Sequence, residues 1–333
     1  MRDLDSWVAE TYSTSLVVID RGIITYEWYA DGLGPNTLFL GASMTKSVLA
    51  HLVGRAVTEQ ALRLDDAVTT YVPELGGSGY DGCRVGDALT MTTGVDWVED
   101  HRDPSSLASQ LVACFSEGDD SRALLTTVRP GAPAGQQFAY CTADSQVLDW
   151  IRERATGLPF TDDLQRLWRD LACTADAVVG SDGYGVALAG GAVAATARDW
   201  ARIGMLAVDG TATSADGAPR RLLDERWVSN AVRPAYPFLA PGRLPSSITA
   251  HAGFGYHWWP LDVGGRQVTA DGSRGQFTFV DRTTGVVVVK TSQWPYDEFL
   301  ADRQFRDLSY LGLPIVADAA VAVRSAQPER TTP

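Results

Sequence analysis

The segments with strand character lie near the two ends of this 333-residue chain, and that distribution limits the folds open to it. Near the N-terminus, 15–19 and 23–29 are rich in β-branched and aromatic residues, and Asp20, Arg21 and Gly22 between them predict a hairpin. Three more such runs, "RQVTADG", "QFTFVD" and "GVVVVKTSQ", follow one another late in the chain. The simplest architecture for this order is one antiparallel sheet built from both chain ends.

The middle of the chain is predicted to be helical. From Met44 onwards the apolar residues recur with a helical period, and "SQVLDWIRERATG" and "FTDDLQRLWRDL" show the same period. We therefore predict the α/β (α+β) class, an antiparallel sheet with flanking helices and a helical insertion. The predicted boundaries describe one unit, 1–333, with a sheet subdomain from about 1–40 and 245–320, a helical subdomain of about 41–244 and a frayed tail of about 321–333.

Composition and charge exclude several classes of partner. The formal net charge is -13 and the pI is about 4.7, so a nucleic acid or an anionic membrane would be repelled. No apolar run approaches the roughly 20 residues that span a bilayer, and the N-terminus lacks the apolar core of a signal peptide, so we expect a cytoplasmic protein. The four cysteines form no C-x-x-C pair, which favours free thiols and no metal site. The oligomeric state is left open.

A Ser-x-x-Lys pattern, Ser43 to Lys46, lies at the predicted helix start. Lysine is rare here, with only two among 28 lysines and arginines, and unlike arginine it can lose its proton when buried. Three residues apart on a helix, the hydroxyl and the amine can reach one another, which is typical of a nucleophile with its base. The alternative is a serine N-cap followed by a first-turn lysine.

Tyr140 precedes another predicted helix in "GQQFAYCTADSQVLDWI". A phenol at this point could shuttle a proton between the serine, the lysine and a leaving group. The alternative is a tyrosine packed beside a helix start that Thr142 caps.

Taken together, these segments resemble a known family. Ser43-x-x-Lys46, "LRLDDAVTTYVPEL", "VGDALTMTTGVDW", Tyr140-Cys141-Thr142, "AGGAVAATARDWARIG", "FGYHWW" and "DGSRGQF" occur in the order found in serine hydrolases that resemble class C β-lactamases and penicillin-binding proteins. The similarity covers almost the whole chain and is greatest to the 6-aminohexanoate-dimer hydrolase and esterase branch. It implies a β-lactamase-like fold.

The resemblance implies roles for particular residues. Ser43 would be the nucleophile, Lys46 its general base and Tyr140 the proton relay. The backbone N–H groups of Ser43 and Ser273 would form an oxyanion hole, worth roughly 3 kcal/mol for each donor. The family needs no cofactor or metal for this chemistry.

The late strand and the tyrosine motif depart from the β-lactamase pattern. Lys-Thr-Gly is usual on that strand, whereas Ala270, Asp271 and Gly272 occupy it here, and Thr142 stands where asparagine is usual. Thr142, Asp271 and Gly272 are expected to contact substrate. Because the chain lacks the lysine of Lys-Thr-Gly and the asparagine of the tyrosine motif, the sequence argues against recognition of a β-lactam.

Tryptophans near these motifs are expected to border the substrate. Trp97 in "GVDWVED" and Trp258 in "FGYHWW" fall in segments that resemble pocket-bordering regions of the family, although tryptophans are more often part of a core.

Two other patterns are interpreted as coincidental. Lys290-Thr291-Ser292 resembles Lys-Thr-Gly but ends the last predicted strand. The segment 77–82, "GSGYDG", matches a dinucleotide-binding glycine pattern without a strand–helix unit around it, so a nucleotide-binding protein remains only a remote alternative.

The sequence therefore predicts serine-dependent acyl transfer through a covalent acyl-enzyme, with hydrolysis of a small amide or ester as the expected outcome. Two alternatives stay open. One is an acyltransferase that forms an amide or ester on the same fold, and the other is a ligand-binding homologue that has lost turnover.

Overall fold

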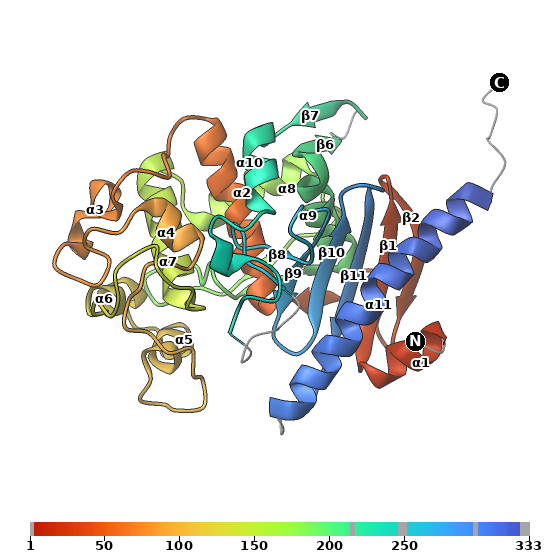
Figure 1. Ribbon diagram of the computed structural model, residues 1–333, viewed down its shortest axis with the longest axis horizontal. Coiled ribbons are helices and arrows are strands. Elements are labelled where there is room, and N and C mark those ends of the chain that lie inside the picture. The colour runs from red at the N-terminus through yellow and green to blue at the C-terminus, as the bar shows by residue number, and fades with distance from the viewer. Residues whose placement is uncertain (1–2, 214–216, 246–251, 296–298, 327–333) are drawn as a thin grey trace.

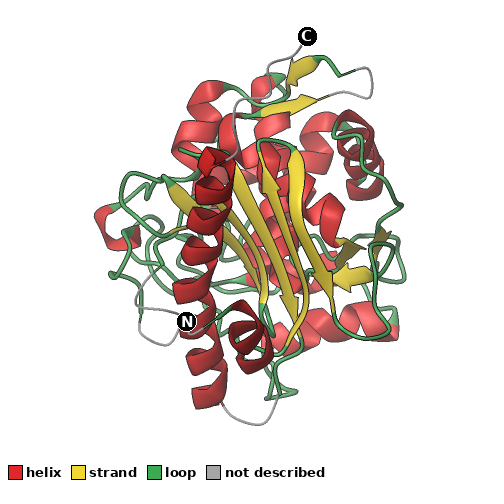
Figure 2. Ribbon diagram, turned by 90° about the vertical axis from the view of Figure 1, so that its right-hand side faces the viewer, coloured by secondary structure: helices red, strands yellow, loops and turns green. Residues whose placement is uncertain are grey.

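The computed structural model describes residues 3–213, 217–245, 252–295 and 299–326, and a six-stranded antiparallel sheet lies at its centre (Figure 2). Both chain ends supply strands to this sheet, which confirms the predicted fold class. In spatial order the strands are β2 (Ile23–Tyr29), β1 (Ser13–Asp20), β11 (Val286–Ser292), β10 (Gln276–Asp281), β9 (Gln267–Gly272) and β8 (Trp259–Pro260).

The sheet is covered on both faces, which explains why β10 and β11 are buried along their whole length. In the run 286–289 of β11, successive valines contribute alternately to the cores on the two faces. Helix α9 (Ala197–Asp209) packs on one face and helix α11 (Phe299–Ala326) on the other (Figure 1). Gly204 permits the close approach of α9, because a Cβ there would lie 2.6 Å from Val287 Cγ1.

Most of the remaining helices and small strands form the part of the molecule that lies beside β8 and β9, whereas helix α1 packs against β1 and α11 (Figure 1). Strands β3, β5 and β4 form one small sheet, and β6 and β7 form a hairpin. The other elements are α1 (Leu4–Glu10), β3 (Leu38–Leu40), η1 (Ala42–Met44), α2 (Thr45–Thr58), α3 (Val68–Tyr71), η2 (Pro73–Leu75), α4 (Val85–Leu89), α5 (Leu107–Glu117), α6 (Ser121–Thr126), α7 (Thr142–Thr156), α8 (Phe160–Asp170), β4 (Val178–Val179), β5 (Val193–Thr196), β6 (Thr211–Thr213), β7 (Pro219–Arg221), α10 (Glu225–Ala231) and η3 (Pro237–Leu239).

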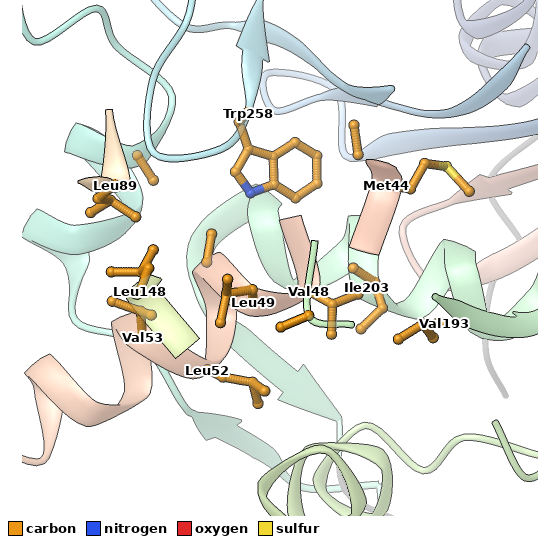
Figure 3. Packing of buried hydrophobic residues seen from close by; sticks show 14 of the residues in the cluster. Met44, Val48, Leu49, Leu52, Val53, Leu89, Leu148, Val193, Ile203 and Trp258 are labelled. Carbon is orange, nitrogen blue, oxygen red and sulfur yellow. The ribbon is translucent and has the colours of Figure 1, made fainter. Parts of the chain in front are cut away.

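Helix α2, which follows the Ser43 turn, is the centre of the larger core. The predicted helix begins at Thr45, one residue after Met44, and every residue from Thr45 to Ala56 is buried. Figure 3 shows its apolar side chains packed against Ile203 of α9 and Trp258. A helix packed on all sides holds its first turn in a fixed place.

Helix α11 differs from the prediction at its end. Residues 321–326, predicted to fray, are helical, and Arg324 forms an ion pair with Asp20. Within the described residues, the segment Arg303–Ala326 is long and apolar enough by length and composition to cross a membrane, and one third of the most apolar window in it is buried. Its buried residues Leu313 and Ala317 pack in the core beneath the sheet.

Lys290 is buried on the α11 face of β11, away from the Ser43 turn. Its amine donates to the Ser292 hydroxyl and, at 3.4 Å, to the Thr11 carbonyl. The rings of Trp7, Phe277 and Trp294 surround it, with centroids 5.6, 5.7 and 5.9 Å from Nζ. Burial lowers the pKa of Lys290 to about 7.

We expect Lys290→Met to change how stability depends on pH. Between about pH 7 and the pKa of about 10.4 of an unfolded lysine, only the unfolded wild type binds this proton, so the free energy of unfolding rises with pH by up to about 1.4 kcal/mol per pH unit. Methionine removes that slope. The free energy of unfolding of Lys290→Met minus that of wild type should therefore become smaller as pH rises from 7 to 10.

Urea unfolding followed by tryptophan fluorescence at several pH values from 7 to 10 measures this difference. Arg63→Met, at a side chain that is 77% exposed, is the control and should leave the slope unchanged. Parallel curves for wild type and Lys290→Met would show that the folded protein keeps Lys290 charged within its aromatic rings.

Candidate active site

Ser43 lies in η1, a tight turn that connects β3 to α2. The preceding residue, Ala42, has a φ of +45°, in the left-handed region that non-glycine residues rarely adopt. Gly41 has no room for a side chain, because a Cβ there would lie 2.2 Å from the ring of Trp200. The Ser43 side chain is half-buried and is held on a strained, well-packed turn.

Lys46, on the first turn of α2, points its amine at three oxygen atoms. Nζ lies 3.2 Å from Ser43 Oγ, 3.2 Å from Thr142 Oγ1 and 2.6 Å from the carbonyl oxygen of Gly190. The residue is 3% exposed. The structure thus brings the serine and the lysine of the Ser-x-x-Lys pattern together, and it adds Thr142 at the start of α7.

Tyr140 lies beside the same amine. Its ring centroid is 5.1 Å from Lys46 Nζ, and the ring stacks on Trp259 with centroids 5.8 Å apart and an interplanar angle of 20°. The rings of Phe254 and Tyr140 are nearly perpendicular, with centroids 6.5 Å apart and an interplanar angle of 83°. The aromatic neighbours hold the phenol close to Lys46.

Glu99, which the sequence analysis missed, is hydrogen-bonded to the Lys46 network. Its Oε2 accepts from Trp97 Nε1 at 2.6 Å and from the Thr142 backbone N–H at 2.9 Å, and its Oε1 accepts from the Thr142 hydroxyl. His101 Nε2 lies 3.1 Å from Oε1. A single hydroxyl, that of Thr142, connects this carboxylate to Lys46.

Glu99 is ionised in this environment. Burial raises its pKa, but the hydrogen bond from His101, the charge of Lys46 and the hydrogen bonds from Thr142 outweigh burial and lower the pKa to about 2. Glu99 lies in "GVDWVED", the segment quoted for Trp97, but the pattern did not indicate its contact with Thr142, which is 43 residues further along the chain. The acidic string "VED" after Trp97 was the only signal.

A neutral histidine lies behind the lysine. His257 Nε2 is 3.0 Å from the Ser145 hydroxyl, and the Ser47 hydroxyl donates to the His257 carbonyl at 2.6 Å. Burial, together with the charge of Lys46, lowers the pKa of His257 to about 3. His257 therefore adds no positive charge beside the Lys46 amine.

The end of β9 reaches the Ser43 turn, although not all of its predicted residues point there. Gly272 packs on Gly41, since a Cβ at Gly272 would lie 2.1 Å from the Gly41 carbonyl oxygen, and Ser273 follows in an exposed turn. Asp271 points to the opposite face, where its carboxylate accepts from Tyr310 of α11. Strand alternation causes this difference, and the prediction that the Asp271 side chain contacts substrate is wrong.

The two tryptophans predicted to border the substrate differ in position. Trp258 is 1% exposed and packs in the core against His51, with ring centroids 5.6 Å apart, so its side chain offers no surface to a ligand (Figure 3). Trp97 is 7% exposed and is hydrogen-bonded to Glu99, next to the site. A contact between Trp97 and substrate stays a prediction.

Other features of the described residues lie away from this chemistry. A surface cavity of about 900 Å³ beside α8 is lined by Trp168, Arg169 and Cys173 among others, and not by Ser43 or Lys46. Within the described part of the chain, no three His, Cys, Asp or Glu side chains are grouped so that they could hold a metal ion.

Comparisons with known proteins identify the family of the chain. The family model described as Beta-lactamase matches residues 8–311. The 6-aminohexanoate-dimer hydrolase of Paenarthrobacter ureafaciens is 33% identical over 301 residues, which cover 88% of this chain and 76% of that protein.

Solved structures share the fold. A candidate 6-aminohexanoate-dimer hydrolase from Bacillus anthracis superposes with a TM-score of 0.79 at 21% identity, covering 97% of this chain and 83% of the other. EstCE1, a hydrolase with promiscuous acyltransferase activity, superposes with a TM-score of 0.67 at 17% identity, covering 92% and 97%. Because the family model matches residues 8–311 and a hydrolase is 33% identical over 88% of the chain, the chain belongs to the β-lactamase family and is a homologue of 6-aminohexanoate-dimer hydrolase.

Proposed function

We propose that this protein hydrolyses a small amide or ester by transferring the acyl group to Ser43 and then to water. The observation that carries the proposal is the distance of 3.2 Å between Lys46 Nζ and the half-buried Ser43 Oγ. A hydroxyl is a weak nucleophile unless a base within hydrogen-bonding distance takes its proton, and Lys46 meets that requirement.

Acylation begins when neutral Lys46 accepts the Ser43 proton and Oγ attacks the substrate carbonyl. The carbonyl oxygen takes the negative charge and is stabilised by the backbone N–H groups of Ser43 and Ser273. The close packing of Gly272 on Gly41 supports this pairing, because it brings the end of β9 next to the Ser43 turn. The bond to the leaving group then breaks as the carbonyl re-forms.

The leaving amine or alcohol needs a proton, for which Tyr140 is the proposed donor. The phenol gives its proton to the leaving group and recovers one from Lys46, so the proton taken from Ser43 leaves with the first product. Water attacks the acyl-enzyme by the same steps in reverse. It gives one proton to Tyr140, which passes its own proton to Lys46, and Lys46 protonates Ser43 Oγ as the acid product leaves with the rest of the water. The position of the Tyr140 ring, 5.1 Å from Lys46 Nζ, supports this role.

The substrate is proposed to be an amide or ester other than a β-lactam. Ala270 is buried and paired with Thr278, so β9 does not present the lysine that grips the β-lactam carboxylate in the resembling enzymes. The homologue at 33% identity is named as a hydrolase of the 6-aminohexanoate dimer, which supports an amide substrate.

Acyl transfer to an amine or alcohol is the second candidate. The acyl-enzyme is the same, and only the acceptor differs. The structural relative EstCE1 is described as a hydrolase with promiscuous acyltransferase activity, which supports testing an alcohol or amine acceptor beside water.

Ser43→Ala and Lys46→Ala should each abolish turnover of a p-nitrophenyl ester, with kcat/KM lowered by about 1,000-fold or more because nucleophile and base act as a unit. Intact mass after fluorophosphonate treatment should show one adduct on the wild type and none on Ser43→Ala.

Ser116→Ala, at an exposed serine of α5 whose hydroxyl donates to the Ala113 carbonyl, is the matched control and should keep both turnover and the adduct. An adduct that persists in Ser43→Ala, or wild-type protein with neither adduct nor turnover across an amide and ester panel, would contradict the proposed function and favour a ligand-binding role.

Tyr140→Phe should separate substrates by their leaving groups. We expect kcat for an alkyl amide to fall by about 100-fold, because its amine must be protonated as it leaves, whereas a p-nitrophenyl ester of the same acyl group should lose less than about fivefold. Phenylalanine keeps the stacking on Trp259. Equal losses for the two substrates would assign Tyr140 a packing role instead of proton transfer.

A further inference from the structure

We propose that Glu99 is a positioning residue: acting through the Thr142 hydroxyl, it orients the Lys46 amine so that the lone pair of its neutral form faces Ser43. This inference rests on the proposed function of Ser43 and Lys46 and adds a requirement to it. A lysine base beside several hydrogen-bonding groups works only if its lone pair points at the nucleophile.

The direction of the hydrogen bond between Lys46 and Thr142 follows from counting hydrogens. Thr142 Oγ1 contacts both Glu99 Oε1 and Lys46 Nζ. An ionised carboxylate only accepts, so the single hydroxyl hydrogen of Thr142 is donated to Glu99. The Lys46 amine must therefore donate to Thr142.

The Gly190 carbonyl uses the second amine hydrogen. It lies 2.6 Å from Lys46 Nζ and can only accept. A neutral amine has two hydrogens and one lone pair, so the remaining direction, toward Ser43 Oγ at 3.2 Å, holds the lone pair. When Ser43 gives up its proton, that proton becomes the third hydrogen of the ammonium, and it is the proton that the proposed mechanism then passes to Tyr140.

Glu99 is itself held in one orientation. Trp97 Nε1 and the Thr142 backbone N–H both donate to Oε2, which leaves Oε1 for the Thr142 hydroxyl and His101. The side chain is 18% exposed. Because the backbone donor belongs to the first turn of α7, the helix dipole also favours the negative charge.

Without this carboxylate, the Thr142 hydroxyl could rotate and donate its hydrogen to the Lys46 lone pair. With its lone pair engaged in that hydrogen bond, the Lys46 amine could not accept the Ser43 proton. The pairing also explains how threonine works where asparagine is usual: a hydroxyl has no fixed donor side, so a fixed acceptor must set its direction.

The test compares Glu99→Gln, Thr142→Val and Thr142→Ser by the rate of fluorophosphonate labelling of Ser43 across pH 5 to 10. Thr142→Ser keeps the hydroxyl and should label within about threefold of wild type. Thr142→Val removes the hydroxyl and should label about 10-fold to 100-fold more slowly at every pH, because a correctly oriented base contributes about 100-fold or more.

Glu99→Gln should show two effects that a helix-capping role would not produce. Its maximal labelling rate should fall by about 10-fold or more, as in Thr142→Val. The acidic limb of its pH profile should also move to lower pH, because removing a negative charge near Lys46 disfavours the ammonium. In Thr142→Val the carboxylate remains, so that limb should stay close to its wild-type position.

Other titratable groups near Lys46 are the same in all variants. His257 and Tyr140 face the amine, and Asp144 and His101 lie near Glu99. Burial raises the pKa of Asp144 to about 7, and the charge of Glu99 adds to that rise. The titration of Asp144 therefore stays the same in Thr142→Val, which keeps Glu99, and moves to lower pH in Glu99→Gln, so the size of the limb shift in Glu99→Gln contains both effects.

The outcomes separate this inference from the proposed function. Suppose that Glu99→Gln and Thr142→Val both keep the wild-type labelling rate and the wild-type acidic limb of the pH profile, and that labelling is lost in Ser43→Ala. This result would overturn the role of Glu99 and leave the acyl-transfer function standing. Labelling that survives Ser43→Ala would overturn both. If Glu99→Gln fails to fold, Thr142→Val against Thr142→Ser still decides whether the hydroxyl orients the base.

Discussion

The hydrogen bonds of the Lys46 amine connect parts of the chain that are far apart in sequence. Ser43 comes from the turn before α2, Thr142 from the start of α7 and Gly190 from the loop before β5. A buried amine without acceptors would cost several kcal/mol, so these segments must meet for the site to exist. The functional geometry and the packing of the helical region therefore depend on the same contacts.

The sheet provides the rigid surface against which this network forms. Helix α9 packs on β10 and β11, and the end of β9 packs on the Ser43 turn where Gly272 meets Gly41. Because a Cβ at Gly272 would lie 2.1 Å from the Gly41 carbonyl oxygen, the strand and the turn approach more closely than a side chain at position 272 would allow. The sheet edge and the helix start are thereby fixed relative to one another.

Much of the architecture could be predicted from local patterns. The hairpin near the N-terminus, the late strands and the buried helix after Met44 each have a periodicity that short-range physics explains. Tyr140, Lys46 and Ser43 were also identifiable, because each lies in a short motif. The contacts of Glu99 and Gly190 with the Lys46 network could not be found in this way, although Gly190 lies in the quoted segment "AGGAVAATARDWARIG", because both residues reach the site only through long-range packing.

The errors have a physical pattern. Asp271 and Trp258 both lie in segments that border the site, but each side chain points into a core. Only tertiary packing decides whether a side chain in such a segment points toward the site or away from it. The sequence by itself determined the class of fold, the antiparallel sheet from both chain ends and the serine and lysine pair, since these follow from periodicity and spacing along the chain. Only the tertiary structure decided which carboxylate and which carbonyl surround the lysine, because hydrogen bonds between distant segments depend on how the helices pack.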